Sequence, residues 1–185
     1  MTGKLELARF KMCLLPFNAS RKKLLNIFKN QRTLMTKLFK DTIIPWLFKW
    51  EGTKLCLHKD DRGNYRDGRL VGTKYGIDAK SHPNVDIPLL TADEATEIYW
   101  NEYWVKYACD EMAWPLNFIF FNCCVNCGLS RASKILKISG NNPSKFIDEQ
   151  EAFYKRLVIH RPASKVFLKG WLNRTRDLRK VCNLS

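Results

Sequence analysis

The feature that most constrains the fold is an abrupt change of residue pattern at Glu51-Gly52. From Thr36 to Trp50, apolar residues recur at spacings of one, three and four, which predicts a helix packed against a core. Pro45 is expected to kink or restart this helix. From Leu55 to Val71, alternating residues and turn signals predict two or three short strands. The sequence therefore predicts a helix that presents Glu51 at its end, followed by a small β-hairpin lobe.

The neighbours of Glu51 suggest chemistry for its carboxyl group. Phe48 and Trp50 flank it in the sequence. A carboxyl group that aromatic neighbours partly shield from water favours its protonated form, which a general acid requires. The polar hairpin that follows can hold a second carboxylate and a hydroxyl group opposite, and glycoside hydrolysis uses such a pair of carboxylates. An ordinary salt bridge at a helix end is the alternative role for Glu51.

Residue patterns beyond the hairpin predict further helices. Thr91 and Glu94 have the spacing of a capping box, which opens a helix through Trp104 or beyond. Segment 116–129 is apolar on nearly every side, as expected of a central buried helix. Later helices are predicted at about 130–138, from about 144 to a stop before Pro162, and at about 166–178. The predicted fold class is α+β and predominantly helical.

Three motifs carry a specific family resemblance. They are Glu51-Gly52, Asp61-Arg62-Gly63-Asn64-Tyr65 and Gly72-Thr73-Lys74-Tyr75-Gly76-Ile77. Together they resemble glycoside hydrolase family 108, the N-acetylmuramidases of phages and prophages, and the resemblance runs over about residues 35–176. It implies a lysozyme-like domain with a small β-hairpin lobe. It also implies an endolysin-type enzyme that cleaves the β-1,4 bond between N-acetylmuramic acid and N-acetylglucosamine in peptidoglycan.

The resemblance and the chemistry of glycoside hydrolysis together assign catalytic roles. Glu51 is the expected general acid, and Asp61 is the expected second carboxylate. Thr73 is expected to hydrogen-bond the attacking water. Asp60 competes with Asp61 for its role, and either one could be an ordinary turn residue.

Substrate-binding roles are expected for aromatic side chains and one amide. Tyr75, Tyr103 and Trp104 offer aromatic faces to pyranose rings, with core packing as the alternative. Asn126 matches a family position that faces the cleft, which implies a contact with an N-acetyl group. At Asn122 the family usually has Asp, so this chain lacks that charge.

Charge divides the 185-residue chain into three parts. Residues 1–40 carry 10 Lys/Arg against 1 acidic residue, residues 41–130 carry 9 against 13, and residues 131–185 carry 13 against 4. We predict a basic N-terminal extension, 1–34, and one muramidase domain, 35–185, acting as a monomer on peptidoglycan glycan strands. Basic ends would hold the enzyme on an anionic wall. The alternative function is a non-catalytic protein on the same scaffold that binds peptidoglycan or nucleic acid.

Neither a metal nor another cofactor is expected. The seven cysteines do not require a disulfide framework in a chain of this length. Cys124 and Cys127 form a CxxC pair beside Cys123, but no second pair completes four ligands, so burial in the helix is preferred over zinc binding. No transmembrane segment or signal peptide is expected. We therefore expect the enzyme in the host cytoplasm before lysis and in the periplasm and cell wall after release.

Overall fold

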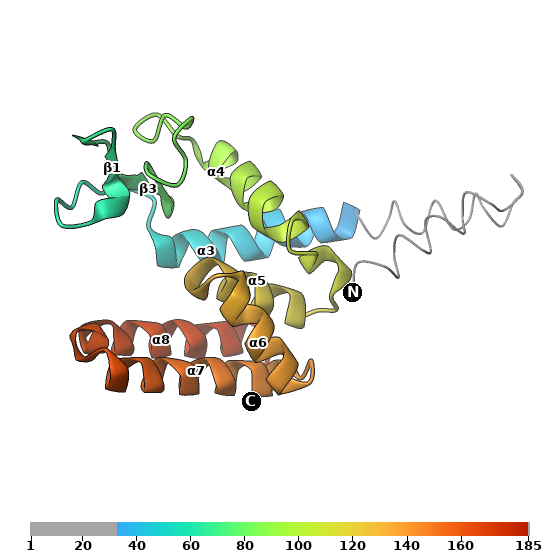
Figure 1. Cartoon of the computed structure of the whole chain (residues 1–185). Coiled ribbons are helices and arrows are strands. Elements are labelled where there is room, and N and C mark those ends of the chain that lie inside the picture. Colours follow the sequence, from blue (N-terminus) through green and yellow to red (C-terminus); the bar gives the residue numbers. More distant parts are fainter. Residues whose placement is uncertain (1–32, 185) are drawn as a thin grey trace, which may run out of the picture. The chain divides into compact units, whose positions relative to one another are not determined.

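A computed structural model describes residues 33–184 of the chain (Figure 1). The chain divides into two compact units, one ending at Glu102 and the other beginning at Tyr103. This boundary lies inside the predicted 35–185 domain. All but two residues of the predicted extension 1–34 lie outside the described residues. The described chain is mostly helical with two small antiparallel sheets, which confirms the predicted fold class.

The predicted first helix is present as a continuous helical segment that changes geometry along its length. Residues 33–38 are α-helical, Phe39–Ile43 form a π-helical segment, and α3 follows at Ile44–Glu51. Pro45 lies in the first turn of α3, directly after the π-helical segment, and has no N–H to donate to the preceding turn. Ile44, Trp46 and Leu47 are buried, so the apolar face predicted from the sequence is the face that packs. Gly52, with a φ of +82°, ends the helix after Glu51.

A small β lobe follows, made of two antiparallel hairpins. Its strands are β1 (Tyr65–Arg66), β2 (Arg69–Leu70), β3 (Thr73–Lys74) and β4 (Ile77–Asp78), preceded by a 3₁₀ turn at Arg62–Asn64. Strands β1 and β2 pair with each other, as do β3 and β4. Two strands, β1 and β2, lie within 55–71, where two or three were predicted, and Cys56 adds only an isolated bridge to Thr73. Leu55 and Leu57 are exposed, so the alternating pattern of this segment does not place its apolar side chains in a core.

Both hairpins turn through two residues with positive φ. These are Asp67 and Gly68 in the first hairpin, at +49° and +76°, and Tyr75 and Gly76 in the second, at +54° and +78°. Positive φ at both central residues is the requirement of a type I′ turn. Asp-Gly meets it at little cost, whereas a tyrosine there has to be held by other contacts. The second hairpin was therefore not apparent from residue propensities.

Two polar residues hold the loops of the lobe together. Asn64 is fully buried, and its backbone oxygen accepts hydrogen bonds from the amides of Val71 and Gly72. Arg66 donates to three carbonyl oxygens: Ala79 at 3.3 Å, His82 at 2.9 Å and Val85 at 2.7 Å. Because the strands are only two residues long, these contacts supply order that the sheets alone cannot provide.

The first unit ends with helix α4, Ala92–Tyr99, which begins as predicted. Thr91 accepts a hydrogen bond from the amide of Glu94, and the Glu94 carboxylate accepts one from the amide of Thr91, so the capping box is confirmed. Beyond α4 the helix continues in π geometry over Trp100–Val105. This agrees with a predicted helix through Trp104.

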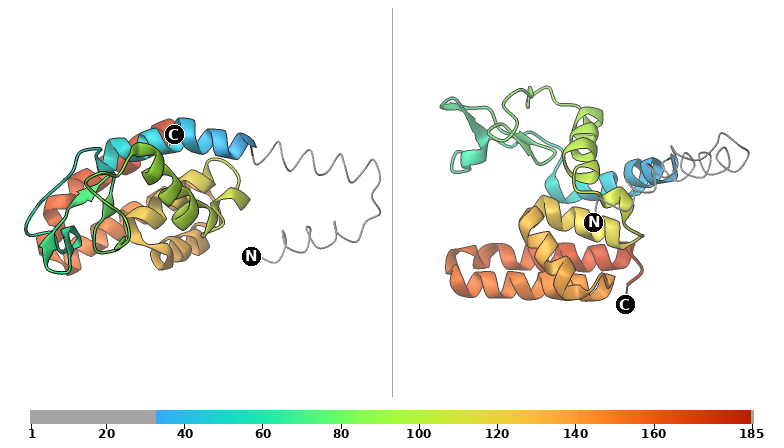
Figure 2. Two further views of the ribbon diagram at one scale, coloured as in Figure 1. Left: turned by 90° about the horizontal axis from the view of Figure 1, so that it is seen from above. Right: turned by 45° about the vertical axis from the view of Figure 1, so that its right-hand side comes forward.

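The second unit is entirely helical in its described part. Its elements are a 3₁₀ turn at Cys109–Glu111, α5 (Leu116–Cys127), α6 (Leu129–Ser139), α7 (Pro143–His160), a 3₁₀ turn at Pro162–Ser164, and α8 (Lys165–Val181). Helices α7 and α8 lie side by side and antiparallel, as Figures 1 and 2 show from different directions. The predicted buried helix is confirmed, since α5 is buried from Asn117 to Cys124. No helix in the described part of the chain combines the length and hydropathy of a membrane span.

A polar pair lies inside this helical unit. Asn122 on α5 is fully buried, and its Oδ1 accepts a hydrogen bond of 2.9 Å from Nε of Arg174 on α8. The Arg174 side chain is itself buried, at 6% exposure. Asn122 Nδ2 has no hydrogen-bond partner among the described residues. The amide at this position thus serves to hold an arginine in the core.

Candidate active site

The first unit contains a pocket of about 630 Å³ beside the end of α3. It is lined by Glu51, Asp61, Gly63, Thr73, Gly76, Asp78, Lys80 and Ser81. All three residues expected to be catalytic are among them, although they come from a helix end, a loop and a strand. The pocket therefore joins the three sequence motifs in one place.

Glu51 is positioned by the close approach of the second hairpin. It is the last residue of α3 and is half-buried. A Cβ atom at Gly76 would lie 3.0 Å from both Cβ and Cγ of Glu51, and 2.6 Å from Oη of Tyr99. Only glycine fits there, so the hairpin backbone packs directly against the glutamate side chain. The hydroxyl of Tyr99 also donates to the carbonyl oxygen of Tyr75 at 2.9 Å, which supports the turn.

Asp61 enters the pocket from the loop before β1. It is the N-cap of the 3₁₀ turn, and its Oδ1 accepts a hydrogen bond of 2.9 Å from the amide of Gly63. The carboxylate is exposed and keeps its second oxygen for other contacts. Asp60 is not among the lining residues. Of the two candidates for the second carboxylate, the structure places Asp61 in the pocket.

Thr73 is oriented by a buried amide. Its hydroxyl lies 2.6 Å from Oδ1 of Asn64, and Asn64 Nδ2 donates to the carbonyl oxygen of His58 at 2.9 Å. Because the second bond fixes which end of the amide faces Thr73, the hydroxyl must donate to Asn64. The lone pairs of the Thr73 oxygen can then accept a hydrogen bond from a water molecule in the pocket.

Asp78 is a pocket residue that the sequence analysis missed. It pairs with Thr73 across β3 and β4, so both side chains project from the same face of the hairpin. Its Oδ1 accepts a hydrogen bond of 2.9 Å from the amide of Ser81. A Cβ atom at Gly63 would lie 3.2 Å from Oδ1 of Asp61 and 3.4 Å from Oδ1 of Asp78. The two aspartates therefore flank the same glycine, and either can serve as the second carboxylate.

A sequence signal for Asp78 does exist. Tyr75-Gly76 as a two-residue hairpin turn would place Thr73 opposite Asp78 by counting outward from the turn. Lys80 and Ser81 also line the pocket, and the amide of Lys80 donates to the carbonyl oxygen of Gly63 at 3.1 Å. The loop after β4 thus closes one side of the site.

The aromatic residues expected to bind sugar are placed elsewhere. Tyr75 is not a lining residue of this pocket, and its ring packs on Phe48 with centroids 4.8 Å apart. Tyr103 belongs to the second unit, where its ring contacts Tyr107 and Phe121. Trp104 is fully buried, which is the alternative that the sequence left open for it.

Asn126, expected to contact an N-acetyl group, also belongs to the second unit. It lines a different pocket, and its Oδ1 accepts a hydrogen bond of 2.8 Å from the hydroxyl of Tyr154. The described residues contain no group of three or more His, Cys, Asp or Glu side chains that could hold a metal ion. The six described cysteines are free thiols; Cys123 and Cys124 are buried as expected, whereas Cys127 is only half-buried and lines the same pocket as Asn126.

The pocket combines carboxylates from a helix end and from the small β lobe, and glycoside hydrolases use such carboxylates for catalysis. Comparison with family models identifies the particular family: residues 44–128 match Glycosyl hydrolase 108. This match confirms the predicted resemblance over these residues, and membership of a glycosyl hydrolase family implies a glycosidase with a glycan substrate. Every lining residue of the pocket lies inside the match. No curated protein and no solved structure matches the chain.

Proposed function

We propose that the chain is an N-acetylmuramidase that cleaves the β-1,4 glycosidic bonds of bacterial peptidoglycan. The observation that carries the proposal is the meeting of Glu51, Asp61 and Thr73 around one pocket inside the glycosyl hydrolase 108 match. Glycoside hydrolysis needs a proton for the leaving oxygen and a carboxylate on the opposite face of the sugar. The pocket contains side chains suited to both tasks.

In this mechanism Glu51 is the general acid. Its protonated carboxyl group donates to the glycosidic oxygen as the bond to the anomeric carbon breaks. Contact with the backbone at Gly76 restricts where the glutamate side chain can lie, and catalysis gains when a reacting group is held in place before reaction. Positioning by the hairpin is therefore part of the proposed role of β3 and β4.

Asp61 and Thr73 act on the attacking water. A water molecule that donates one proton to the Asp61 carboxylate and the other to the Thr73 oxygen presents its lone pair to the anomeric carbon. Thr73 can accept this hydrogen bond because its own hydroxyl group donates to Asn64 Oδ1. Asp61 then takes the proton that the water loses, and the leaving group carries the proton from Glu51. After one turnover Glu51 is ionised and Asp61 is protonated.

Asp78 is a second candidate for the role of Asp61, because it lines the same pocket in register with Thr73. Single variants separate the two. If Asp61 activates the water, Asp61→Asn lowers the hydrolysis rate by about 10²–10⁴-fold, while Asp78→Asn has the smaller effect of a residue that holds the loop to Ser81. The reverse order of the two effects would transfer the role to Asp78.

The proposal is tested by clearing of purified peptidoglycan suspensions and by analysis of the released fragments. Glu51→Gln keeps the volume of the side chain but has no acidic proton, so we expect a loss of about 10²–10⁴-fold with an unchanged circular dichroism spectrum. Glu111→Gln, at an exposed glutamate of the second unit, is the matched control and should hydrolyse like the wild type. Substantial hydrolysis by Glu51→Gln would remove Glu51 from the mechanism.

The alternative, a non-catalytic binding protein, is favoured only by the net charge of +14. It predicts that the wild type binds insoluble peptidoglycan or nucleic acid without releasing fragments. For the catalytic case we further propose an endolysin role: synthesis in the host cytoplasm, release through a separate membrane pore, and lysis from the periplasm. Lysis of host cells upon co-expression with such a pore-forming protein, and survival with Glu51→Gln, would support this role.

A further inference from the structure

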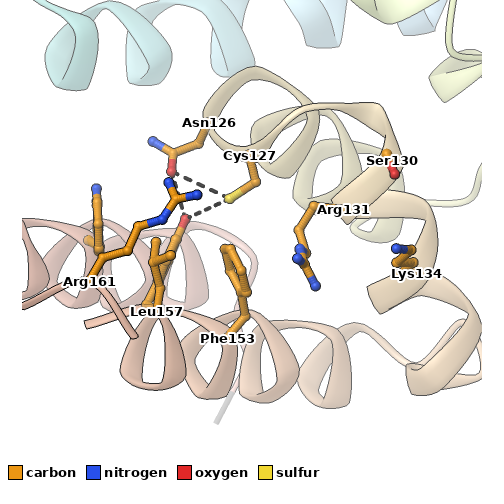
Figure 3. A pocket seen from close by; sticks show the side chains of 10 residues that line it. Asn126, Cys127, Ser130, Arg131, Lys134, Phe153, Leu157 and Arg161 are labelled. Carbon is orange, nitrogen blue, oxygen red and sulfur yellow. Dashed lines mark hydrogen bonds between the residues drawn. The ribbon is translucent and has the colours of Figure 1, made fainter. Parts of the chain in front are cut away.

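The second unit contains a pocket of its own, with a volume of about 480 Å³. Its walls come from the end of α5, from α6, from α7 and from α8 (Figure 3). The lining residues are Asn126, Cys127, Ser130, Arg131, Lys134, Phe153, Tyr154, Leu157, Arg161 and Trp171. Apart from its first residues, this pocket lies beyond the family match at 44–128.

Apart from the ionisable thiol of Cys127, the charged side chains of this pocket are cationic. Arg131, Lys134 and Arg161 line it, and no aspartate or glutamate does. Within the described residues, none of the three makes an ion pair. Three cations around one concavity raise the local concentration of anions and favour an oxyanion inside it.

Arg131 is held in place by an aromatic ring rather than by a carboxylate. Its guanidinium carbon lies 4.2 Å from the centroid of Phe153, a cation–π contact. The stacking leaves the N–H groups at the edge of the guanidinium plane, where a carboxylate or phosphate binds two of them at once. The arginine is thus oriented without its hydrogen-bonding capacity being used.

The other polar groups of the pocket also favour an acceptor. Tyr154 donates its hydroxyl proton to Asn126 Oδ1 at 2.8 Å and accepts from Nε2 of Gln150 at 2.8 Å. Asn126 therefore retains its Nδ2 donor for a ligand. Tyr154 also stacks on Trp171, with centroids 4.9 Å apart, which adds a flat apolar wall. Flat apolar walls suit the C–H face of a sugar ring.

Cys127 provides a chemical reporter inside the same pocket. Its Sγ lies 3.4 Å from Oη of Tyr154. A hydrogen bond from Cys123 lowers the pKa of Cys127 to about 7, with smaller contributions from Tyr154 and from the positive charge of Arg174, against the opposing effect of burial. The thiolate is the nucleophilic form, so we expect this thiol to react with iodoacetamide near neutral pH. A ligand in the pocket would shield it.

We propose that this pocket is a separate binding site for a carboxylate- or phosphate-bearing ring ligand, held by Arg131, Lys134 and Arg161 against the Tyr154–Trp171 wall. The source of the ligand is an acidic component of the bacterial wall, and this choice of source rests on the proposed function. A polynucleotide fits less well, because a concave volume of this size takes one or two small groups, whereas a strand binds along an extended groove.

The test uses the full chain, and single sugars serve as ligands because they contain no glycosidic bond that the enzyme could cleave. N-acetylmuramic acid and N-acetylglucosamine are a close pair, because they differ only in the 3-O-lactyl group that carries the carboxylate. We expect calorimetry to show at least about tenfold tighter binding of the acid, since a charge-assisted hydrogen bond is worth more than 1.4 kcal/mol. Glycerol 3-phosphate tests a phosphate source, and a single-stranded oligonucleotide tests the alternative.

Protection of Cys127 locates the binding. Iodoacetamide labelling at pH 7.5, followed by peptide mass spectrometry, should slow at Cys127 in the presence of the acidic ligand and stay unchanged at the exposed Cys56. Equal affinity for the two sugars, or binding without protection of Cys127, would overturn the proposal. Binding and protection by the oligonucleotide alone would assign the pocket to nucleic acid instead.

Paired variants of equal charge complete the design. Arg131→Gln with Arg161→Gln removes two cations of the pocket, and we expect binding of the acidic ligand to weaken by about tenfold or more. Arg156→Gln with Arg176→Gln removes two exposed cations outside it and should have little effect. Equal loss in both pairs would mean that net charge alone is responsible. Binding and hydrolysis are measured separately. Absence of ligand binding with normal hydrolysis would therefore overturn only the pocket proposal, and absence of hydrolysis with normal binding would overturn only the proposed function.

Discussion

Replacement of Gly76 by alanine tests whether the hairpin positions Glu51. The residue has a φ of +78°, which costs an alanine about 1–2 kcal/mol. The added Cβ would also lie 2.6 Å from Oη of Tyr99 and 3.0 Å from Cβ and Cγ of Glu51. Forcing a methyl group into such a space typically costs a further 1–3 kcal/mol or so. We therefore expect Gly76→Ala to lower the free energy of unfolding by about 2–5 kcal/mol, the sum of the two costs.

Gly68→Ala is the matched control for the backbone cost. Gly68 has a φ of +76° in the first hairpin, and no atom lies within 4 Å of its would-be Cβ. This variant should lose about 1–2 kcal/mol of stability and keep its activity. The difference between the two variants isolates the contact of residue 76 with Glu51 and Tyr99.

The activity readout is the rate of peptidoglycan hydrolysis per folded molecule, with the folded fraction taken from circular dichroism at the assay temperature. A displacement of a catalytic group by about 1 Å can cost 10²-fold, so we expect a loss of that order in Gly76→Ala. Addition of Tyr99→Phe removes the 2.6 Å contact but not the contacts with Glu51, and should not restore the rate. A Gly76→Ala enzyme as active as Gly68→Ala would refute the positioning role of the hairpin.

Two further predictions concern the second unit. Asn122→Asp places a carboxylate beside the buried Arg174, and we expect a gain of about 1–3 kcal/mol in the free energy of urea unfolding at pH 7. That gain should vanish as the pH falls through the lowered pKa of the new carboxyl group. No gain at pH 7 would mean that the amide already satisfies the arginine. Burial raises the pKa of the thiols of Cys124 and Cys182 from 9.0 to about 12, so the unfolded state ionises first and stability should fall as the pH rises from about 9 toward 12. Each thiol lowers the free energy of unfolding, measured by urea titration, by up to about 1.4 kcal/mol per pH unit in this range. If the variant Cys124→Ala with Cys182→Ala loses stability with pH as steeply as the wild type, these two thiols are not the cause.

The helices were predictable because their signals are local. The apolar period of 36–50, the capping box at Thr91 and Glu94, and the turn before α7 each depend on residues within one or two helical turns. Their boundaries agree within a few residues with the structure. The two-unit division was not predictable in this way, because it depends on which helices pack together rather than on the pattern of any one helix.

The second hairpin shows why part of the site escaped prediction. A tyrosine with positive φ contradicts residue propensity, and Tyr75 is held there by the ring of Phe48 and by the hydroxyl of Tyr99. These partners are distant in the sequence, so the turn is fixed by tertiary contacts. Without the turn, the register that pairs Thr73 with Asp78 could not be derived, and Asp78 went unnoticed. Glu51, Asp61 and Thr73 were found because their motifs are contiguous in the sequence.

The two pockets have opposite charge, and this matters for an enzyme acting on an anionic polymer. Glu51, Asp61 and Asp78 line the first pocket against one cation, Lys80, and this excess of carboxylates disfavours the approach of a polyanion. A site that must keep such a cluster cannot also supply much electrostatic affinity for its substrate. The cationic pocket of the second unit can supply it instead, since residues 131–185 carry 13 Lys/Arg against 4 acidic residues. On this reasoning, loss of the pocket cations should raise KM on intact peptidoglycan and its sensitivity to salt, while kcat remains that of the wild type.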